Sequence, residues 1–149
     1  MVSQQDIQNF LNEKVIAVAG VSRNKQKFSN EIYKQLKIKG YQVYPLNPHM
    51  TEHEGDRCYP SFSSLPEKPG AVVCAVNKNS SLNVVRDAYE SGISKIWIQN
   101  GAESEEAIDF CKEKNMNVVY KECILMFASP AGFHKFHKWV NGLFGKLPV

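Results

Sequence analysis

The 149-residue chain lacks the features that membrane insertion or export would require. No run approaches the roughly 20 apolar residues that span a bilayer. Residues 1–14 contain no positively charged region followed by an apolar one, as a signal peptide would. No C-x-x-C pair is present, which disfavours a zinc site; the cysteines are Cys58, Cys74, Cys111 and Cys123. We therefore expect a cytoplasmic protein with reduced thiols and no membrane span.

Signatures of catalysis are also missing. The sequence has no nucleophile elbow, no H-E-x-x-H motif and no pair of carboxylates at a suggestive spacing. His134 and His137 have the spacing of one helix face, but no third ligand lies near them, so no metal site is expected. These absences predict no catalytic residue and favour a binding function over an enzyme.

Strand and helix patterns alternate along the chain. Strands are predicted at residues 15–19, 41–46, 71–76, 95–98 and 117–120, with a short further strand at 57–59. Helices are predicted at residues 30–39, 80–91 and 104–114, with a turn or short helix at 60–65. This alternation indicates right-handed βαβ units, so we expect an α/β fold with a parallel sheet.

The predicted helices have distinct inward faces. In the first, Ile32, Tyr33 and Leu36 share one face, and Gly40 is expected to end the helix. In the helix at 80–91, the residues expected to point inward are Leu82, Val85, Ala88 and Tyr89.

The first strand runs into a basic loop that starts with Gly20, and a helix begins near Ser29 or Asn30. In open α/β sheets this order forms a phosphate site, because backbone N–H groups and the positive end of the helix dipole point to one spot. Ser22 adds a hydroxyl donor, and the loop carries three cations, Arg23, Lys25 and Lys27. The net charge of +3 is too small to indicate nucleic acid, but this cluster predicts a phosphorylated small-molecule ligand.

The loop departs from the dinucleotide-binding pattern G-x-G-x-x-G. It reads Gly20-Val21-Ser22, and the next glycine is Gly40. An NAD site also places an acidic residue after the second strand, where it accepts a hydrogen bond from the ribose. This chain has Asn47-Pro48 there. The residues therefore indicate a nucleotide site and disfavour an NAD site.

Five pieces of the chain resemble small coenzyme A (CoA)-binding proteins related to the nucleotide-binding domain of the succinyl-CoA synthetase α subunit. They are AVAGVSRNKQKFSN, VYPLNP, EGDRCYPSFSSLP, the strand ending in AVN, and WIQNGAES, and they cover about residues 12–123. The resemblance implies a Rossmann-like, three-layer αβα fold with a mainly parallel five-stranded sheet that holds CoA or acyl-CoA. CoA carries a pyrophosphate and a 3′-phosphate, which suit a cluster of Arg and Lys.

The resemblance also implies roles for the segments that follow the strands. Residues 20–30 would meet the pyrophosphate, chiefly through Gly20, Ser22 and Arg23. Asn47-Pro48 would border the adenosine, residues 76–78 would line the ligand and residues 99–102 would shape the far rim. The expected cofactor-binding residues are Gly20, Val21, Ser22, Arg23, Lys27, Phe28, Ser29, Asn30, Asn47, Pro48, Val76, Asn77, Lys78, Gln99, Gly101 and Ala102.

The chain departs from its relatives in two places. Asn77-Lys78 stands where relatives often have a proline pair, and a longer extension follows Cys123. We expect a single domain, 1–149, with its core at about 12–123 and a helical extension at 128–149. The basic aromatic extension would pack on the sheet; docking to a partner or a membrane surface is the alternative. Cys58 lies in a loop expected to face the ligand, so a mixed disulfide with CoA is a hypothesis.

The favoured function is a non-catalytic CoA-binding module, a carrier or sensor for CoA or acyl-CoA. The alternatives are an NAD(P)- or other nucleotide-binding regulator and a small CoA-dependent enzyme or enzyme subunit. The expected partner is a small-molecule ligand and not nucleic acid, while a protein partner or homodimer stays open.

Overall fold

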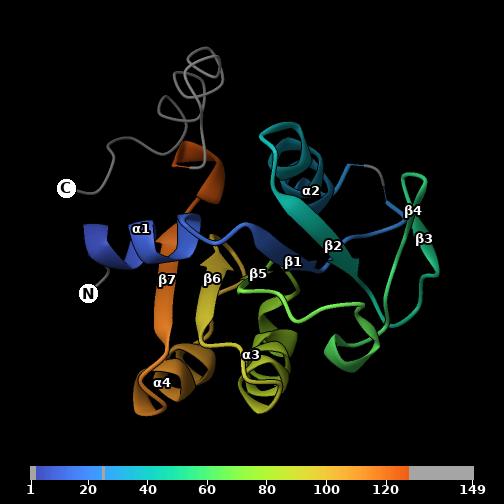
Figure 1. Ribbon diagram of the computed structural model, residues 1–149. Helices are drawn as coiled ribbons and strands as arrows, with labels where there is room; N and C mark the ends of the chain where they lie inside the picture. Colours follow the sequence, from blue (N-terminus) through green and yellow to red (C-terminus); the bar gives the residue numbers. More distant parts are fainter. Residues whose placement is uncertain (1–2, 25, 128–149) are drawn as a thin grey trace.

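The computed structural model describes residues 3–24 and 26–127 and shows an α/β fold (Figure 1). Five parallel strands form the central sheet in the order β2-β1-β5-β6-β7. This confirms the predicted Rossmann-like fold and its parallel sheet. The strands are β1 (Val15–Ala19), β2 (Gln42–Leu46), β5 (Ala71–Cys74), β6 (Lys95–Gln99) and β7 (Asn117–Glu122).

Helices cover both faces of this sheet and give the three predicted layers. Alternate residues of a strand point to opposite faces, so Ile16 and Val18 enter one apolar cluster and Ala17 and Ala19 the other. The first cluster includes side chains of α1 and α2, and the second includes side chains of α3 and α4. The helices are α1 (Gln4–Leu11), α2 (Phe28–Ile38), α3 (Ser81–Glu90) and α4 (Glu105–Glu113).

The predicted end of α2 is confirmed. Gly40 has a φ of +99°, and its N–H donates to the carbonyl of Lys37 at 3.0 Å. The Tyr41 N–H donates to the carbonyl of Leu36 at 3.2 Å. These two bonds satisfy the last carbonyls of the helix, and the left-handed backbone that they need favours glycine.

The predicted inward face of α3 is only partly correct. Val85 and Ala88 are fully buried, but Tyr89 is 42 % exposed. Its ring meets Phe110 of α4 edge-on at 5.8 Å, and the Lys114 ammonium lies 5.4 Å from its centre. Tyr89 was placed wrongly because at this turn the helix borders α4 rather than the sheet.

The N-terminal helix α1 was not predicted. The Ser3 hydroxyl accepts from the N–H of Asp6 at 3.1 Å, and the Asp6 carboxylate accepts from the N–H of Ser3 at 3.2 Å. This reciprocal cap is a helix-start signal that the sequence contains. Ile7 and Phe10 are buried, and the Phe10 ring meets Trp97 of β6 edge-on at 5.4 Å.

The short strand predicted at 57–59 is instead a hairpin followed by a single contact with the sheet. β3 (Glu52–His53) and β4 (Asp56–Arg57) pair antiparallel, and Tyr59 forms an isolated parallel bridge with Leu46 of β2. If Tyr59 is counted as a strand, the order becomes 3-2-1-4-5-6, that of dinucleotide-binding folds. The described residues also form single-turn 3₁₀ helices: η1 (Phe62–Ser64), η2 (Lys78–Ser80) and η3 (Ile124–Met126).

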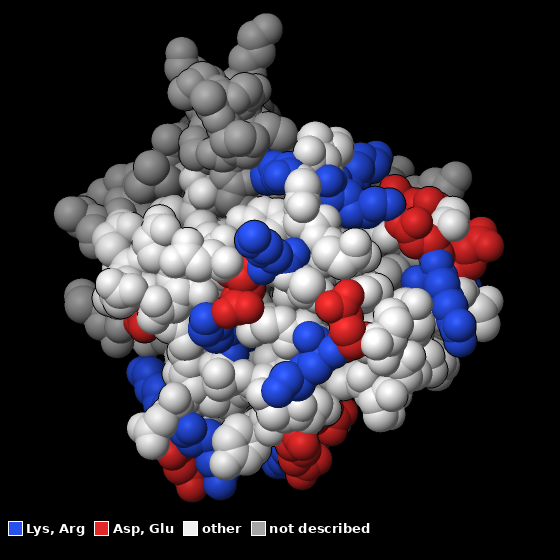
Figure 2. Space-filling view, viewed as in Figure 1, with Lys and Arg blue, Asp and Glu red and all other residues white. Residues whose placement is uncertain are grey.

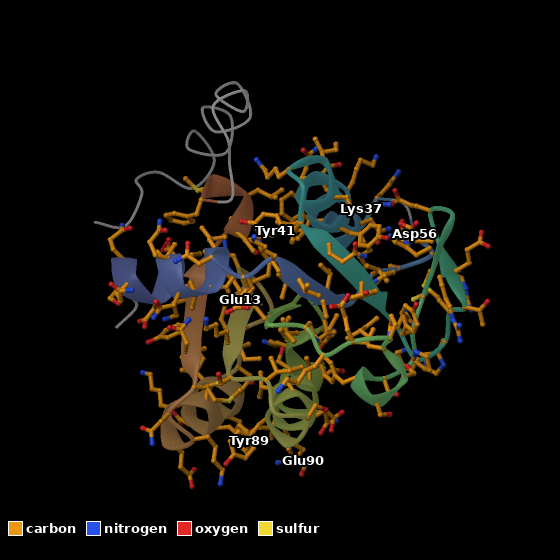
Figure 3. The ribbon with its side chains drawn as sticks, viewed as in Figure 1. Glu13, Lys37, Tyr41, Asp56, Tyr89 and Glu90 are labelled. Atoms are coloured by element: carbon orange, nitrogen blue, oxygen red, sulfur yellow. The ribbon has the colours of Figure 1, made fainter. Side chains whose placement is uncertain are left out.

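The hairpin is fastened to α2 through Asp56, whose carboxylate accepts from the Tyr33 hydroxyl and the Lys37 ammonium (Figure 3). The Tyr33 ring also meets His53 edge-on at 4.9 Å. Figure 2 shows lysines gathered over α2 beside the acidic side chains of the hairpin. Opposite charges thus face each other between these two elements.

Several predictions fall on residues outside the described part of the chain. These are the helical extension at 128–149, with His134 and His137, and the loop cation Lys25. Among the described residues, no helix has the length and apolar character needed to cross a membrane.

Candidate ligand-binding site

The site begins where β1 ends at Gly20. This glycine has a φ of +115°, and its N–H donates to the carbonyl of Leu46 at 3.2 Å. A Cβ at this position would lie 2.4 Å from the carbonyl oxygen of Ala75, beyond the end of β5. Only glycine allows the backbones after β1 and β5 to approach so closely. The approach lies at the switch point of the sheet, where open α/β folds bind ligands.

A cleft of about 810 Å³ opens beside this approach. It is bounded by the loops after β1 and β2, the segment around η1, the end of β5 and one side of α3. The lining residues are Ala19, Gly20, Val21, Ser22, Lys27, Leu46, Asn47, Pro48, His49, Pro60, Ser61, Phe62, Ser63, Ala75, Val76, Asn77, Ser80, Asn83, Val84, Asp87, Glu90 and Ser91.

Half of the predicted site residues line this cleft. They come from three of the four predicted segments and are Gly20, Val21, Ser22, Lys27, Asn47, Pro48, Val76 and Asn77. The other half lies elsewhere: Arg23, Phe28, Ser29, Asn30, Lys78, Gln99, Gly101 and Ala102. The structure therefore brings the loops after β1, β2 and β5 together, as the topology predicts.

Arg23 of the loop and the predicted residues in the first turn of α2 lie outside the cleft. The Arg23 guanidinium donates to the backbone carbonyl of His49, across the gap between the loops after β1 and β2. Ser29 and Asn30 are buried, with 6 % and 5 % exposure, whereas Phe28 is 39 % exposed.

The predicted residues at the end of β6 and just after it form part of the protein framework. Gln99 is buried, and its side-chain oxygen accepts from the N–H of Ile124 at 3.1 Å. Ala102 is buried, and its carbonyl accepts from the Ser81 hydroxyl. The Gly101 N–H donates to the Glu103 carboxylate at 2.9 Å. This rim braces α3 and the segment after β7.

Asn47 occupies the position where an NAD site has a carboxylate. Its side-chain amide donates to the carbonyl of Val21 at 2.7 Å, and its side-chain oxygen accepts from the N–H of His49 at 2.7 Å. Both ends of the carboxamide therefore join protein groups, and the position offers no charged acceptor to a ribose. This geometry agrees with the departure from the NAD pattern seen in the sequence.

One wall of the cleft was missed from the sequence. On α3 and at its two ends, Ser80, Asn83, Asp87 and Ser91 recur at spacings of three or four residues and line the cleft together with Val84. That recurrence is a helix-face signal and could have identified the wall. Pro60 to Ser63 also line the cleft. Their place there follows from tertiary structure and could not be predicted from local patterns.

Charge differs between the parts of the cleft. Lys27 belongs to the loop before α2, and Asp87 and Glu90 belong to α3. An anionic group is therefore favoured beside the Gly20 loop and disfavoured beside α3.

The expectation that Cys58 faces the ligand is wrong. Cys58 is 3 % exposed and lies in the apolar cluster that contains α1 and α2. Burial raises the pKa of its thiol, which keeps it protonated and unreactive. Cys74, predicted to be a core residue, is fully buried. In the described part of the chain, no three His, Cys, Asp or Glu side chains are grouped to hold a metal ion.

The parallel sheet, the glycine turn and the cleft at the switch point define an α/β protein with a Rossmann-like fold. The model of the CoA binding domain family matches residues 14–129, so the chain belongs to this family.

Individual relatives fall into two groups. An uncharacterized Bacillus subtilis protein, YneT, is 29 % identical to this chain. The match spans 82 % of this chain and 91 % of YneT. The α subunit of a Pyrococcus furiosus ADP-forming acetate–CoA ligase II is 25 % identical over the matched region. That match spans 77 % of this chain but 28 % of the ligase subunit. A solved structure of a hypothetical protein from Pyrococcus horikoshii superposes with a TM-score of 0.77 and 31 % identity, covering 83 % of this chain and 87 % of that one.

Proposed function

We propose that this chain binds CoA or an acyl-CoA in the cleft beside the Gly20 loop and acts as a binding module, a carrier or sensor. One observation carries the proposal: the residues that line the cleft, from Ala19 to Ser91, all lie within the match to the CoA binding domain.

The pyrophosphate of CoA would lie against Gly20 to Ser22. The absent side chain at Gly20 leaves the backbone accessible, and Lys27 supplies a positive charge at this end of the cleft. Arg23 would leave the carbonyl of His49 to reach a phosphate, since its side chain starts from the same loop.

The adenosine would lie against Asn47-Pro48 and Val76-Asn77, which line the cleft. Asn47 would border it while its carboxamide holds the carbonyl of Val21 and the N–H of His49 in place. The absence of an acidic ribose partner at this position supports CoA over NAD. Gln99, Gly101 and Ala102 would support the site from behind, given their bonds to the framework.

A second candidate is that the domain works as the CoA-binding part of a larger enzyme. The similarity to 28 % of an ADP-forming ligase subunit supports it, since a domain of this size corresponds to one part of that protein. In that case the remaining chemistry would come from a partner chain.

A cleft-obstructing variant tests the location of the ligand. Asn83 is exposed on α3 and lines the cleft, so Asn83→Trp should obstruct part of it and weaken CoA binding at least tenfold. Gln8→Trp is the matched control, because Gln8 is exposed on α1 outside the cleft. Thermal unfolding checks that both variants fold. A folded Asn83→Trp protein that binds CoA as well as the wild type would place the ligand elsewhere.

A further inference from the structure

The loop between β1 and α2 is held by one buried side chain. Asn30 lies in the first turn of α2 and is 5 % exposed. Its side-chain oxygen accepts from the N–H of Ser22 at 2.9 Å. Its side-chain amide donates to the carbonyls of Ser22, at 2.9 Å, and of Asn24, at 3.1 Å. One carboxamide therefore makes three hydrogen bonds to a loop six to eight residues away.

These bonds change which backbone groups the loop offers to a ligand. The carbonyl of Val21 is also occupied, by the side-chain amide of Asn47 at 2.7 Å. Three carbonyl oxygens of residues 21–24 thus accept from side-chain amides inside the protein. Within the described part of the chain, the backbone N–H groups of Val21 and Arg23 donate no hydrogen bond to a protein acceptor. The N–H groups of Ser22 and Asn24 are occupied by the Asn30 side chain and the Ser22 hydroxyl. Carbonyl oxygens repel an anion and N–H groups attract one, so the loop offers a phosphate the donors of Val21 and Arg23 while three of its carbonyls are engaged inside the protein.

We propose that Asn30 is a positioning residue of the ligand site: it does not touch the ligand, but it orients the loop so that backbone donors face the phosphates. The inference rests on the proposed function for the identity of the ligand. It replaces the role that the family resemblance implies, in which Asn30 would contact CoA directly. Asn30 does not line the cleft, whereas Ser22, which it holds, does.

Asn30→Asp is the sharpest test because it keeps the shape of the side chain and removes both donors. A carboxylate cannot donate to the carbonyls of Ser22 and Asn24, and it adds a negative charge near the phosphates. Since the two hydrogen bonds donated by the amide are lost while only the bond accepted from the Ser22 N–H can persist, we expect CoA affinity to fall at least about tenfold. Asn115→Asp is the matched control, since Asn115 is exposed beyond the end of α4 and outside the cleft.

Two readouts separate a positioning role from direct contact. The first is the dissociation constant for CoA and for inorganic pyrophosphate, measured by calorimetry. The second is the set of backbone amide NMR signals of Val21 to Asn24 in ligand-free protein. We expect these signals to shift in Asn30→Asp and both affinities to fall by similar factors. Weakened binding with unshifted signals would mean that residue 30 acts on the ligand directly, through contact or charge, and not through the loop. Shifted signals with unchanged binding would mean that the ligand lies elsewhere. Either result overturns the inference.

The wild-type protein supplies the remaining controls. If it binds pyrophosphate but not CoA, the proposed function fails while the effect of Asn30→Asp on pyrophosphate still decides the inference. If it binds neither, both fail. If Asn30→Asp does not fold, hydrogen exchange of the Asn30 side-chain amide in the wild type decides: slow exchange is expected, and exchange as fast as that of a free amide overturns the inference.

Discussion

At the scale of single residues, two glycines with similar backbones have different surroundings. Gly20 and Gly40 have φ angles of +115° and +99°. A Cβ at Gly20 would lie 2.4 Å from the carbonyl oxygen of Ala75, whereas one at Gly40 would meet nothing within 4 Å. A residue with a Cβ would therefore suffer both backbone strain and a steric clash at position 20, but backbone strain alone at position 40.

Alanine substitutions should separate these two effects. Each should cost roughly 1–2 kcal/mol of unfolding free energy because of the positive φ. Gly20→Ala should lose clearly more than Gly40→Ala, since the backbones after β1 and β5 must also move apart. Urea unfolding measures both values. Equal losses would mean that the approach between Gly20 and Ala75 does not constrain the fold.

Lys27 should matter to binding rather than to folding. It lines the cleft next to the Gly20 loop, so Lys27→Ala should weaken CoA binding roughly tenfold, as expected for a lost charge-assisted contact with phosphate. Lys34→Ala removes the same charge from an exposed position of α2 outside the cleft and should leave affinity close to wild type. Calorimetry at low and high salt checks the origin of the effect, which should shrink as salt rises. If both variants weakened CoA binding equally, the affinity would depend on the net charge of the protein and not on the position of Lys27.

Part of the lining of the cleft could be predicted from residue type, but the rest depends on the directions in which side chains point. Gly20, Lys27 and Asn47 could be identified because their chemistry and position after a strand are readable in sequence. The direction of Arg23 toward His49 and the burial of Gln99 depend on packing between distant segments. No local pattern contains that information.

At the scale of elements, α2 and the β3–β4 hairpin form a unit joined at Asp56. Hydrogen bonds from Lys37 and then from Tyr33 hold the pKa of the Asp56 carboxyl below its usual value. The ionised form is therefore favoured in the folded protein. Its stabilising effect is full above the unfolded-state pKa of about 3.9 and is lost as pH falls through the lower folded-state value.

Asp56→Asn should expose this dependence. Near pH 7 the variant should unfold at a lower temperature than the wild type, and the gap should close as the pH falls through the lowered folded-state pKa of Asp56, where the wild-type carboxyl becomes protonated. Unfolding midpoints over a pH series measure the gap. Asp109→Asn, on the exposed face of α4, is the control and should show little gap at any pH. A gap for Asp56→Asn that stays constant with pH would contradict the role of the charge.

Element patterns predicted the sheet and three helices with ends within two residues of those observed. Continuous apolar runs such as 71–74 are unambiguous because both faces of a parallel strand are buried. The hairpin at 52–57 escaped prediction because its strands have only two residues each. α1 escaped although its capping signal, Ser3 and Asp6, is present in the sequence.

At the scale of the whole molecule, the four cysteines lie within the apolar interior. Their exposure is 3 % or less, and burial raises the pKa of Cys74 to about 11 and that of Cys111 to about 12. A thiol reagent should therefore modify none of them within minutes in the folded protein and all four in urea. Rapid reaction at one site of the folded chain, Cys58 above all, would contradict this arrangement.

The order of the strands places the loops after β1, β2 and β5 around one cleft, and CoA is the ligand that family membership and this cleft support. Titration calorimetry of the wild-type protein with CoA, acetyl-CoA and NAD side by side tests this claim most directly. We predict saturable binding of CoA or acetyl-CoA with micromolar affinity and no heat of binding with NAD. Binding of NAD in preference to CoA, or no binding of any of the three, would contradict it.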